Sequence, residues 1–228
     1  MRRYAFICAL SLCALLVGSV SARASERPAD FSGFSLGLQS GYGFGASDWC
    51  FCSPVSVASD AAGGDGGIDV GLHAAYGVRL GPLALEAETR LSYADIAFSD
   101  MCDAALACKG KTDWLGEAGV SAGIVFWGDK KLAATIGYAV GDVRTKTTVL
   151  SGLAAGASRE DSSMHDGMVY GVHGEQAMNG GWRFGLEYKY YDMSGDNLTV
   201  DAAGAPVDAK IDWHAHVIGF TISYELNK

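Results

Sequence analysis

The sequence predicts an all-β protein in which eight antiparallel strands close into an up-and-down transmembrane β-barrel, preceded by a cleaved signal peptide. Three observations predict this fold. The N-terminus has the composition of an export signal, apolar residues alternate with polar or small ones in eight later segments, and the connections between these segments are short and long in turn. Period-two alternation indicates strands with two different faces, and short turns opposite long loops are typical of outer-membrane barrels.

The export signal occupies residues 1–24. Its start carries two arginines, residues 4–20 are mostly apolar, and residues 21–24 (Ser-Ala-Arg-Ala) offer a cleavage site after Ala24. The apolar stretch is short for a membrane helix of about 20 residues, and no positive cluster follows it. We therefore expect a signal peptide over 1–24 and one barrel domain over 25–228, exported through the general secretion pathway.

The eight alternating segments are the predicted strands. The pattern is clearest where Trp182, Phe184, Leu186, Tyr188 and Tyr190 share one face, opposite charged or small residues. The same alternation recurs over residues 34–42, 68–80, 83–93, 114–126, 132–140, 168–175 and 218–225. Several of these segments have ten or more residues, which is enough for a tilted strand to cross a bilayer.

The connections predict which ends of the strands meet. Gly81-Pro82, Gly128-Asp129-Lys130 and Asn179-Gly180-Gly181 have the residues of tight turns. The other connections are long and rich in Gly, Ala, Ser and Asp, and they are predicted to be loops over residues 44–67, 99–112, 146–165 and 192–210.

The apolar face is expected to contact lipid. The opposite face is crowded with Gly, Ala and Ser, as a narrow lumen requires. Aromatic residues recur near strand ends, where membrane interfaces collect them: Tyr42, Tyr76, Tyr93, Trp114, Phe126, Trp127, Trp182 and Tyr224. Because every backbone group in hydrocarbon must be paired internally, the sheet is expected to close.

Two segments resemble a known family. Residues 182–192 (WRFGLEYKYYD) and 31–43 (FSGFSLGLQSGYG) are similar to the penultimate and first strands of small alpha-proteobacterial outer-membrane surface antigens. These proteins are also called opacity-type or outer-membrane immunogenic proteins. The resemblance covers nearly all of residues 25–228 except the loops. It implies an eight-stranded barrel related in architecture to the membrane domain of outer-membrane protein A.

The resemblance to this family implies several possible functions, and the chain differs from the family pattern at two places. Members are described as surface antigens, porin-family proteins or envelope-stability proteins, and a few bind haem. The chain departs from the family pattern at its end, Tyr224-Glu-Leu-Asn-Lys228, which has no terminal aromatic residue. It also has Gly219 where an inward arginine is expected.

The inward face of the predicted barrel carries many charges. Because a lone buried charge is costly, we expect these side chains to form a paired network that fills the lumen. Arg183 is expected opposite or diagonal to Glu175, and Lys189 near Glu117 or Glu88. A charge-lined pore is the alternative, since inward glycines leave room for a thin water path. The predicted lumen set is Arg79, Glu86, Glu88, Arg90, Glu117, His173, Glu175, Arg183, Glu187, Lys189 and Glu225.

Four cysteines remain after signal cleavage: Cys50, Cys52, Cys102 and Cys108. An even number in an exported chain predicts disulfide bonds, and Cys-x-Cys is an unusual spacing for zinc. Cys102 and Cys108 could close a small loop, but Cys50 and Cys52 would then form a strained ring. Bridges between the two loops avoid that strain, and the pairing stays open.

No catalytic residue, metal site or cofactor is expected. No histidine is expected to have a serine two residues away on the same face, and no nucleophile, base and orienting acid converge in the sequence. His214 and His216, near the outer end of the last predicted strand, are weak candidates for contact with haem or a metal.

The composition and pattern predict a protein of the cell outer membrane. Three of the 17 basic residues, and none of the 26 acidic ones, precede residue 25, so the mature part has a formal charge of −12 and is a poor nucleic-acid ligand. The leading hypothesis is a structural and surface-antigen barrel that displays four long extracellular loops. The alternatives are a narrow porin-like diffusion channel and a surface binding protein for haem, a host ligand or a cation. The expected partners are outer-membrane lipid and lipopolysaccharide, the barrel-assembly machinery, and host or surface ligands reached through the loops.

Overall fold

The structure is a computed structural model. It describes residues 31–51, 58–60, 65–103, 106–150, 155–195, 198–202 and 205–226. The predicted signal peptide and Cys52 lie outside these residues. Within the described part of the chain, no helix is both long enough and apolar enough to cross a membrane.

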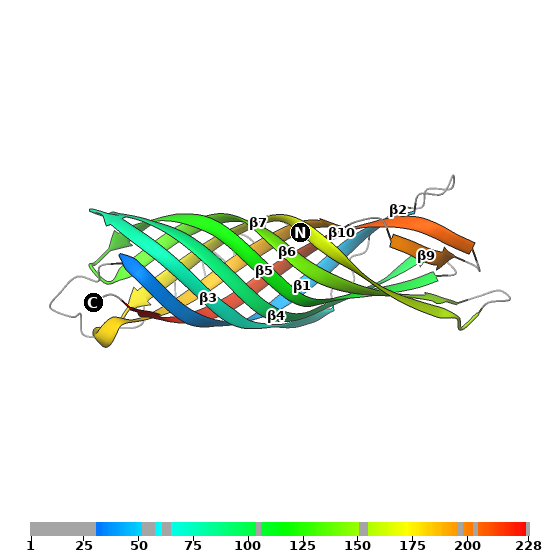
Figure 1. The fold of residues 1–228 in the computed structure, drawn as a ribbon, viewed down its shortest axis with the longest axis horizontal. Coiled ribbons are helices and arrows are strands. Elements are labelled where there is room, and N and C mark those ends of the chain that lie inside the picture. The colour runs from blue at the N-terminus through cyan, green and yellow to red at the C-terminus, as the bar shows by residue number, and fades with distance from the viewer. Residues whose placement is uncertain are drawn as a thin grey trace.

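Eight long antiparallel strands form a closed ring, which confirms the predicted fold (Figure 1). They are β1 (Gly33–Phe51), β3 (Gly66–Leu80), β4 (Leu83–Asp103), β5 (Leu106–Phe126), β6 (Lys130–Val149), β7 (Ser158–Ala177), β8 (Trp182–Gly195) and β10 (Ala205–Glu225). Each pairs with its neighbours in chain order. The ring closes where β1 pairs with β10, from Ser35 opposite Glu225 to Phe51 opposite Ala209.

Two short strands extend the wall at the outer end. β2 (Ala58–Asp60) pairs with the end of β1, and β9 (Leu198–Ala202) pairs with the start of β10. Figure 1 shows both at the end of the barrel opposite the tight turns.

The three predicted tight turns lie together at the other end. β3 and β4 are joined through Gly81, whose φ is 65°, and β5 and β6 through Trp127 (φ 52°) and Gly128 (φ 83°). β7 and β8 are joined by a single 3-10 turn, η1 (Asn179–Gly181). Positive φ angles favour glycine, which explains why these positions are rich in it. Short turns lie on the periplasmic side in outer-membrane barrels, and we therefore use the word periplasmic for this end.

The prediction of four long loops is wrong for most of their described residues. β4 continues to Asp103 and β5 begins at Leu106, while β6 continues to Val149 and β7 begins at Ser158. The strands therefore extend well beyond the length that a bilayer requires.

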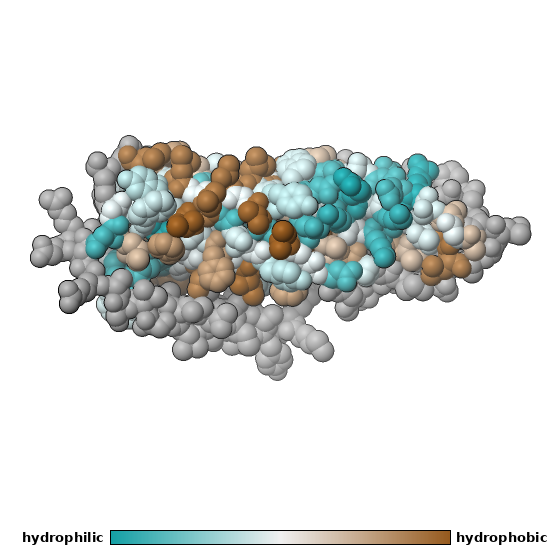
Figure 2. All heavy atoms as spheres, turned by 90° about the horizontal axis from the view of Figure 1, so that it is seen from below, coloured by the Kyte–Doolittle hydropathy of each residue, from teal (hydrophilic) through white to brown (hydrophobic). Residues whose placement is uncertain are grey.

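The outer extension has the opposite polarity to the part predicted to lie in the membrane. On β10, even-numbered residues 218–224 are the outward apolar set, whereas odd-numbered residues 211–217 are apolar and point inward. The outward positions at that level are charged or polar, as at Asp192 and Asp212. Figure 2 shows brown hydrophobic spheres over the periplasmic part of the wall and teal spheres further toward the outer end.

This reversal has a simple physical cause. Exposed apolar side chains on the lower wall, such as Phe220 (65% exposed), are stable in contact with lipid. The extension has the arrangement of a soluble barrel, in which apolar side chains turn inward away from water. The predicted orientation of an apolar outside and a polar inside holds for the lower part, and the extension, for which loops were predicted, has the opposite orientation.

Candidate functional site

The lumen is the candidate site, and side chains fill it in three successive layers. An aromatic side chain lies at the periplasmic end, a network of buried ion pairs lies above it, and an apolar core fills the outer part. Eight strands enclose a space only wide enough for side chains, so each layer can be complete.

Arg90 on β4 is the centre of the ion-pair network. Its guanidinium lies 2.6 Å from the Glu187 carboxylate and 3.3 Å from that of Glu88, and it donates a 2.8 Å hydrogen bond to Gln39 Oε1. Only 5% of the Arg90 side chain is exposed. Arg90 and Glu187 are 97 residues apart in sequence and meet across the lumen because the sheet closes.

Lys189 on β8 completes this level of the network. Its ammonium forms an ion pair with Glu117 and lies 4.0 Å from Glu88. Tyr191, two residues further along β8, donates a 3.0 Å hydrogen bond to the same Glu117 carboxylate. Because each buried charge faces an opposite one, the network avoids most of the cost of isolated burial.

A second ion-pair group lies nearer the periplasmic end. Arg183 Nε donates to Glu225 at 2.9 Å, and the same guanidinium lies 3.1 Å from Glu86. Lys131 on β6 forms an ion pair with Glu86 and lies 3.1 Å from Glu175. Arg183 and Glu175 themselves are 3.8 Å apart across the β7–β8 hairpin.

Phe31 closes the lumen beneath these charges. It is completely buried against Ala84 and Val125. The Arg183 guanidinium lies 4.9 Å from the centre of its ring and the Lys131 ammonium 5.5 Å away, both within cation–π range. Phe31 therefore serves as an apolar seal and also contacts the lowest cations of the network.

The outer apolar core is built around Trp213 on β10 and Phe98 on β4, both almost fully buried, with ring centres 6.5 Å apart. Tyr191 lies 6.5 Å from Trp213 and joins this core to the ion pairs below. Gly110 on β5 faces Phe98, and a Cβ atom at Gly110 would overlap the Phe98 ring. The small residue is needed there because the large ring occupies its space.

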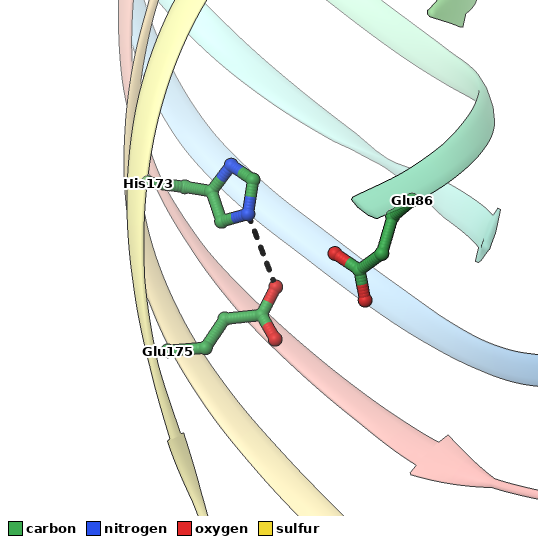
Figure 3. Close-up of side chains that lie close together, drawn as sticks. All are labelled: Glu86, His173 and Glu175. Carbon is green, nitrogen blue, oxygen red and sulfur yellow. Dashed lines mark ion pairs between the residues drawn. The ribbon is translucent and has the colours of Figure 1, made fainter. Parts of the chain in front are cut away.

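Glu86, His173 and Glu175 form the one cluster of potential metal ligands among the described residues (Figure 3). Their ligand atoms lie within 4.8 Å of one another, and His173 Nε2 is 3.4 Å from Glu175. Lys131 and Arg183 already neutralise both carboxylates. A metal ion would have to compete with these two buried cations, so we assign none to the cluster.

A small polar cavity lies beside this cluster. Its volume is about 10 Å³, enough for one water molecule. His73 and His173 line it, and His73 Nδ1 is buried with no hydrogen-bond partner among the described protein atoms, whereas the only neighbour printed for His173 Nε2 is the Glu175 carboxylate, 3.4 Å away. A water molecule bound there would satisfy such atoms. The cavity is far too small to serve as a conduction path.

Ten of the eleven predicted lumen residues meet in this network, and Arg79 does not. Arg79 lies at the β3–β4 turn, where its Nε donates to the Gly81 carbonyl at 2.8 Å. The predicted lumen set did not include Lys131, Gln39 or Asp69, although Gln39 accepts from Arg90 and donates to Asp69 at 3.4 Å. Lys131 lies between the predicted turn, residues 128–130, and the predicted strand that begins at residue 132, although it has the same parity as the inward residues of β6.

Gly219, where the family resemblance implied an inward arginine, does point inward. A Cβ atom there would lie 3.3 Å from Glu187 Oε1, so the missing side chain leaves space for Glu187. The arginine that pairs with Glu187 comes instead from β4, as Arg90.

The two candidate cofactor residues lie on the outside of the wall. The Tyr188 hydroxyl and His216 Nδ1 are 2.7 Å apart, and His214 Nδ1 lies 3.0 Å from Asp192. Both imidazoles stack on tyrosine rings of β8. They belong to an outward aromatic patch and do not face the lumen.

One expectation about histidines is wrong. Ser163 lies two residues from His165, with Oγ 3.4 Å from Nδ1. The same Nδ1 is 3.2 Å from the Ser163 carbonyl, so its proton is directed to that carbonyl and it is not placed to act as a base.

Of the four cysteines after residue 24, only Cys108 has a side chain within the described part of the structure. Cys108 is buried on β5. Cys50 and Cys102 lie on β1 and β4, but their side chains, like the whole of Cys52, lie outside the described part of the structure.

A closed ring of strands with an apolar exterior band and a charged interior defines a transmembrane β-barrel protein. The chain belongs to the family of outer membrane protein beta-barrel domains, whose family model matches residues 10–225. No curated protein matches the chain.

Several solved structures share the fold at low identity. Ail, the attachment invasion locus protein of Yersinia pestis, is 10% identical over 85% of this chain and 99% of its own, with a TM-score of 0.38. Neisserial surface protein A is 14% identical over 86% and 98%, with a TM-score of 0.40. OprG from Pseudomonas aeruginosa is 12% identical over 88% and 100%, with a TM-score of 0.47.

Proposed function

We propose that this protein is a non-enzymatic, non-conducting barrel that acts as a structural and surface-exposed component of the outer membrane. The observation that carries the proposal is the filled lumen. Phe31, the Arg90 and Arg183 ion pairs, and the Trp213 core occupy successive levels of the barrel. An ion crossing the barrel would have to displace all three layers.

The physical cost of opening such a path is high. Separating Arg90 from Glu187 would leave two charges buried without partners, and each such charge costs several kcal/mol. The apolar layer above would have to admit water among fully buried side chains such as Trp213. These costs favour a permanently closed barrel over the porin-like alternative.

Conductance in planar lipid bilayers tests the proposal. Purified protein should give no reproducible conductance steps, whereas a wide porin in the same bilayers gives large ones. Regular steps from the folded wild-type barrel, absent from the heat-unfolded sample, would show that the lumen conducts and would overturn the non-conducting role.

Surface exposure is tested by epitope insertion. Gly156, between β6 and β7, is exposed and has a φ of 90°. A Cβ atom on this residue would have no other atom within 4 Å, so a short tag should be tolerated there. Gly81 offers a matched site at the opposite end. Antibody should bind intact cells with the tag at Gly156, and should bind the Gly81 tag only after permeabilisation. The reverse result would invert the proposed orientation.

Two further proposals concern processing. We propose cleavage after Ala24, which the intact mass of the exported protein tests directly. We also propose that the exported chain holds its cysteines in disulfides. This is supported by Cys108, which is buried and disulfide-bonded. Alkylation without reduction should leave the mass unchanged, and uptake of alkylating groups by several cysteines would contradict the proposal.

A further inference from the structure

Four basic side chains form a block on the outer surface of β5 and β6, beyond the apolar band. Lys109 is the direct cross-strand partner of Lys146, and Lys111 is that of Arg144. All four lie at outward positions, since the residues that alternate with them, such as Thr145, are buried. The side chains of Arg144, Lys146 and Lys111 are 59%, 47% and 40% exposed. The basic block is therefore accessible from outside the barrel.

This arrangement is unfavourable unless anions surround it, because like charges directly opposite each other destabilise a sheet. Lys109 faces Ser99 on β4 and has no ion pair among the described residues. Exposed ion pairs contribute little to stability, so a stronger anion can displace the carboxylates that contact the other three cations. Each of these carboxylates contacts one cation of the block: Asp95 contacts Lys111 at 2.9 Å, Asp113 contacts Arg144 at 2.5 Å, and Glu160 contacts Lys146 at 2.8 Å.

The basic block lies just beyond the outer aromatic residues of the wall. Trp114 on β5 is the strand partner of Tyr93 on β4 and of Asp142 on β6, and both rings are exposed. Arg144 and Lys146 follow Asp142 by two and four residues, which is about 7 and 13 Å along the strand. Because aromatic rings gather at the membrane–water interface, cations at this distance lie at the depth of lipid headgroups.

We propose that the basic block binds the phosphate groups of lipid A, the phosphorylated glycolipid of the outer leaflet of outer membranes. Its headgroup carries a phosphate at each end of a disaccharide, which suits two rows of paired cations better than a single phosphodiester does. The Arg144 guanidinium can hold one phosphate through two parallel N–H bonds, while Lys109 and Lys146 act as point charges. The inference rests on the proposed orientation, in which this end of the barrel faces outward.

Native mass spectrometry of the full barrel in mild detergent, free of divalent cations, tests the proposal with diphosphoryl lipid A as the probe. Lys109→Gln removes a cation of the block without breaking an ion pair of the described residues, and should weaken retention about fivefold, equivalent to about 1 kcal/mol. Arg79→Gln is the matched control, since it removes one positive charge at the periplasmic turns. It should retain lipid A as the wild type does.

A second pair of variants predicts a change of opposite sign. Glu160→Gln removes the carboxylate that competes for Lys146, so retention of diphosphoryl lipid A should rise about twofold. Asp192→Asn removes the same charge on β8, away from the basic block, and should leave retention unchanged. A heat-dependent gel shift confirms that each variant is folded.

The choice of lipid is tested with phosphatidylglycerol, which carries one phosphodiester and should be retained less than diphosphoryl lipid A. Equal retention by Lys109→Gln and the wild type, equal loss in Arg79→Gln, or equal retention of the two lipids by the wild type would each overturn the proposal. These measurements use purified protein, whereas orientation is tested with tags on intact cells, so a failure of the lipid site is distinguishable from a failure of the proposed function.

Discussion

Replacing Arg90 by methionine should destabilise the barrel by about 3–5 kcal/mol, the usual cost of removing one partner from a buried ion pair. Arg90 is the cation nearest to both Glu187 and Glu88, at 2.6 and 3.3 Å, and is 5% exposed. Methionine has a similar length and fits an apolar space, so the loss would come from charge and hydrogen bonding more than from packing.

Lys189 limits how much stability the Arg90→Met substitution can remove. Its ammonium lies 4.0 Å from Glu88 and keeps its own ion pair with Glu117, so these carboxylates retain a cation. Arg90→Lys keeps the charge but loses the planar fork that also donates to Gln39, and should cost about 1.5–3 kcal/mol. The order wild type, lysine, methionine is therefore expected.

The assay is urea unfolding of the protein in lipid vesicles, followed by fluorescence of its five tryptophans and by heat-dependent gel mobility. Arg90→Met combined with Glu187→Leu replaces the pair with apolar side chains and should recover part of the loss. If Arg90→Met lay within about 0.5 kcal/mol of the wild type, the range of ordinary surface substitutions, the network would not be a stabilising feature of the lumen.

Three other predictions use the same preparation. Trp213→Ala should lower the free energy of unfolding by about 3–5 kcal/mol because it leaves a cavity in the outer apolar core. Trp213→Phe should lower it clearly less. Equal losses for the two variants would contradict the packing role of Trp213. Phe31→Ala should lower the free energy of unfolding by a similar amount, because Phe31 is completely buried. An unchanged urea midpoint would show that Phe31 does not seal the lumen. The Lys146 ammonium, 2.8 Å away, lowers the pKa of Glu160 in the outer extension, so any stability from this exposed pair is present at neutral pH and falls as acid protonates Glu160. Lys146→Gln should return that pKa toward its ordinary value in an NMR titration, and no change would refute the assignment.

Much of the wall was predictable because each strand has one apolar outer face and one polar face toward the lumen. Trp182, Phe184 and Leu186 alternate with Arg183 and Gly185, and this alone separates the lipid face from the lumen face. Glycine at positions 81 and 128 identified two tight turns, because only glycine adopts positive φ easily. Both the alternation and the turn glycines are local properties, because each involves residues that are close together in the sequence.

The outer extension could have been found from the same kind of pattern. Residues 211–217 and 218–224 both alternate, but their apolar positions have opposite parity, with Val217 and Ile218 adjacent at the change. The small and acidic residues of such segments favour loops over strands, and this composition hides the alternation. The change of parity marks where the surroundings of the wall change from lipid to water.

By itself the sequence determined the period-two alternation, the number of strands in the ring and the apolar band on its outside. Only the tertiary structure decided which charges meet, because Arg90 and Glu187 belong to strands that face each other across a closed ring. Their meeting depends on the stagger with which β1 joins β10, and that long-range register is not contained in any local segment. The same closure brings Phe31, Lys131 and Arg183 together and so seals the lumen.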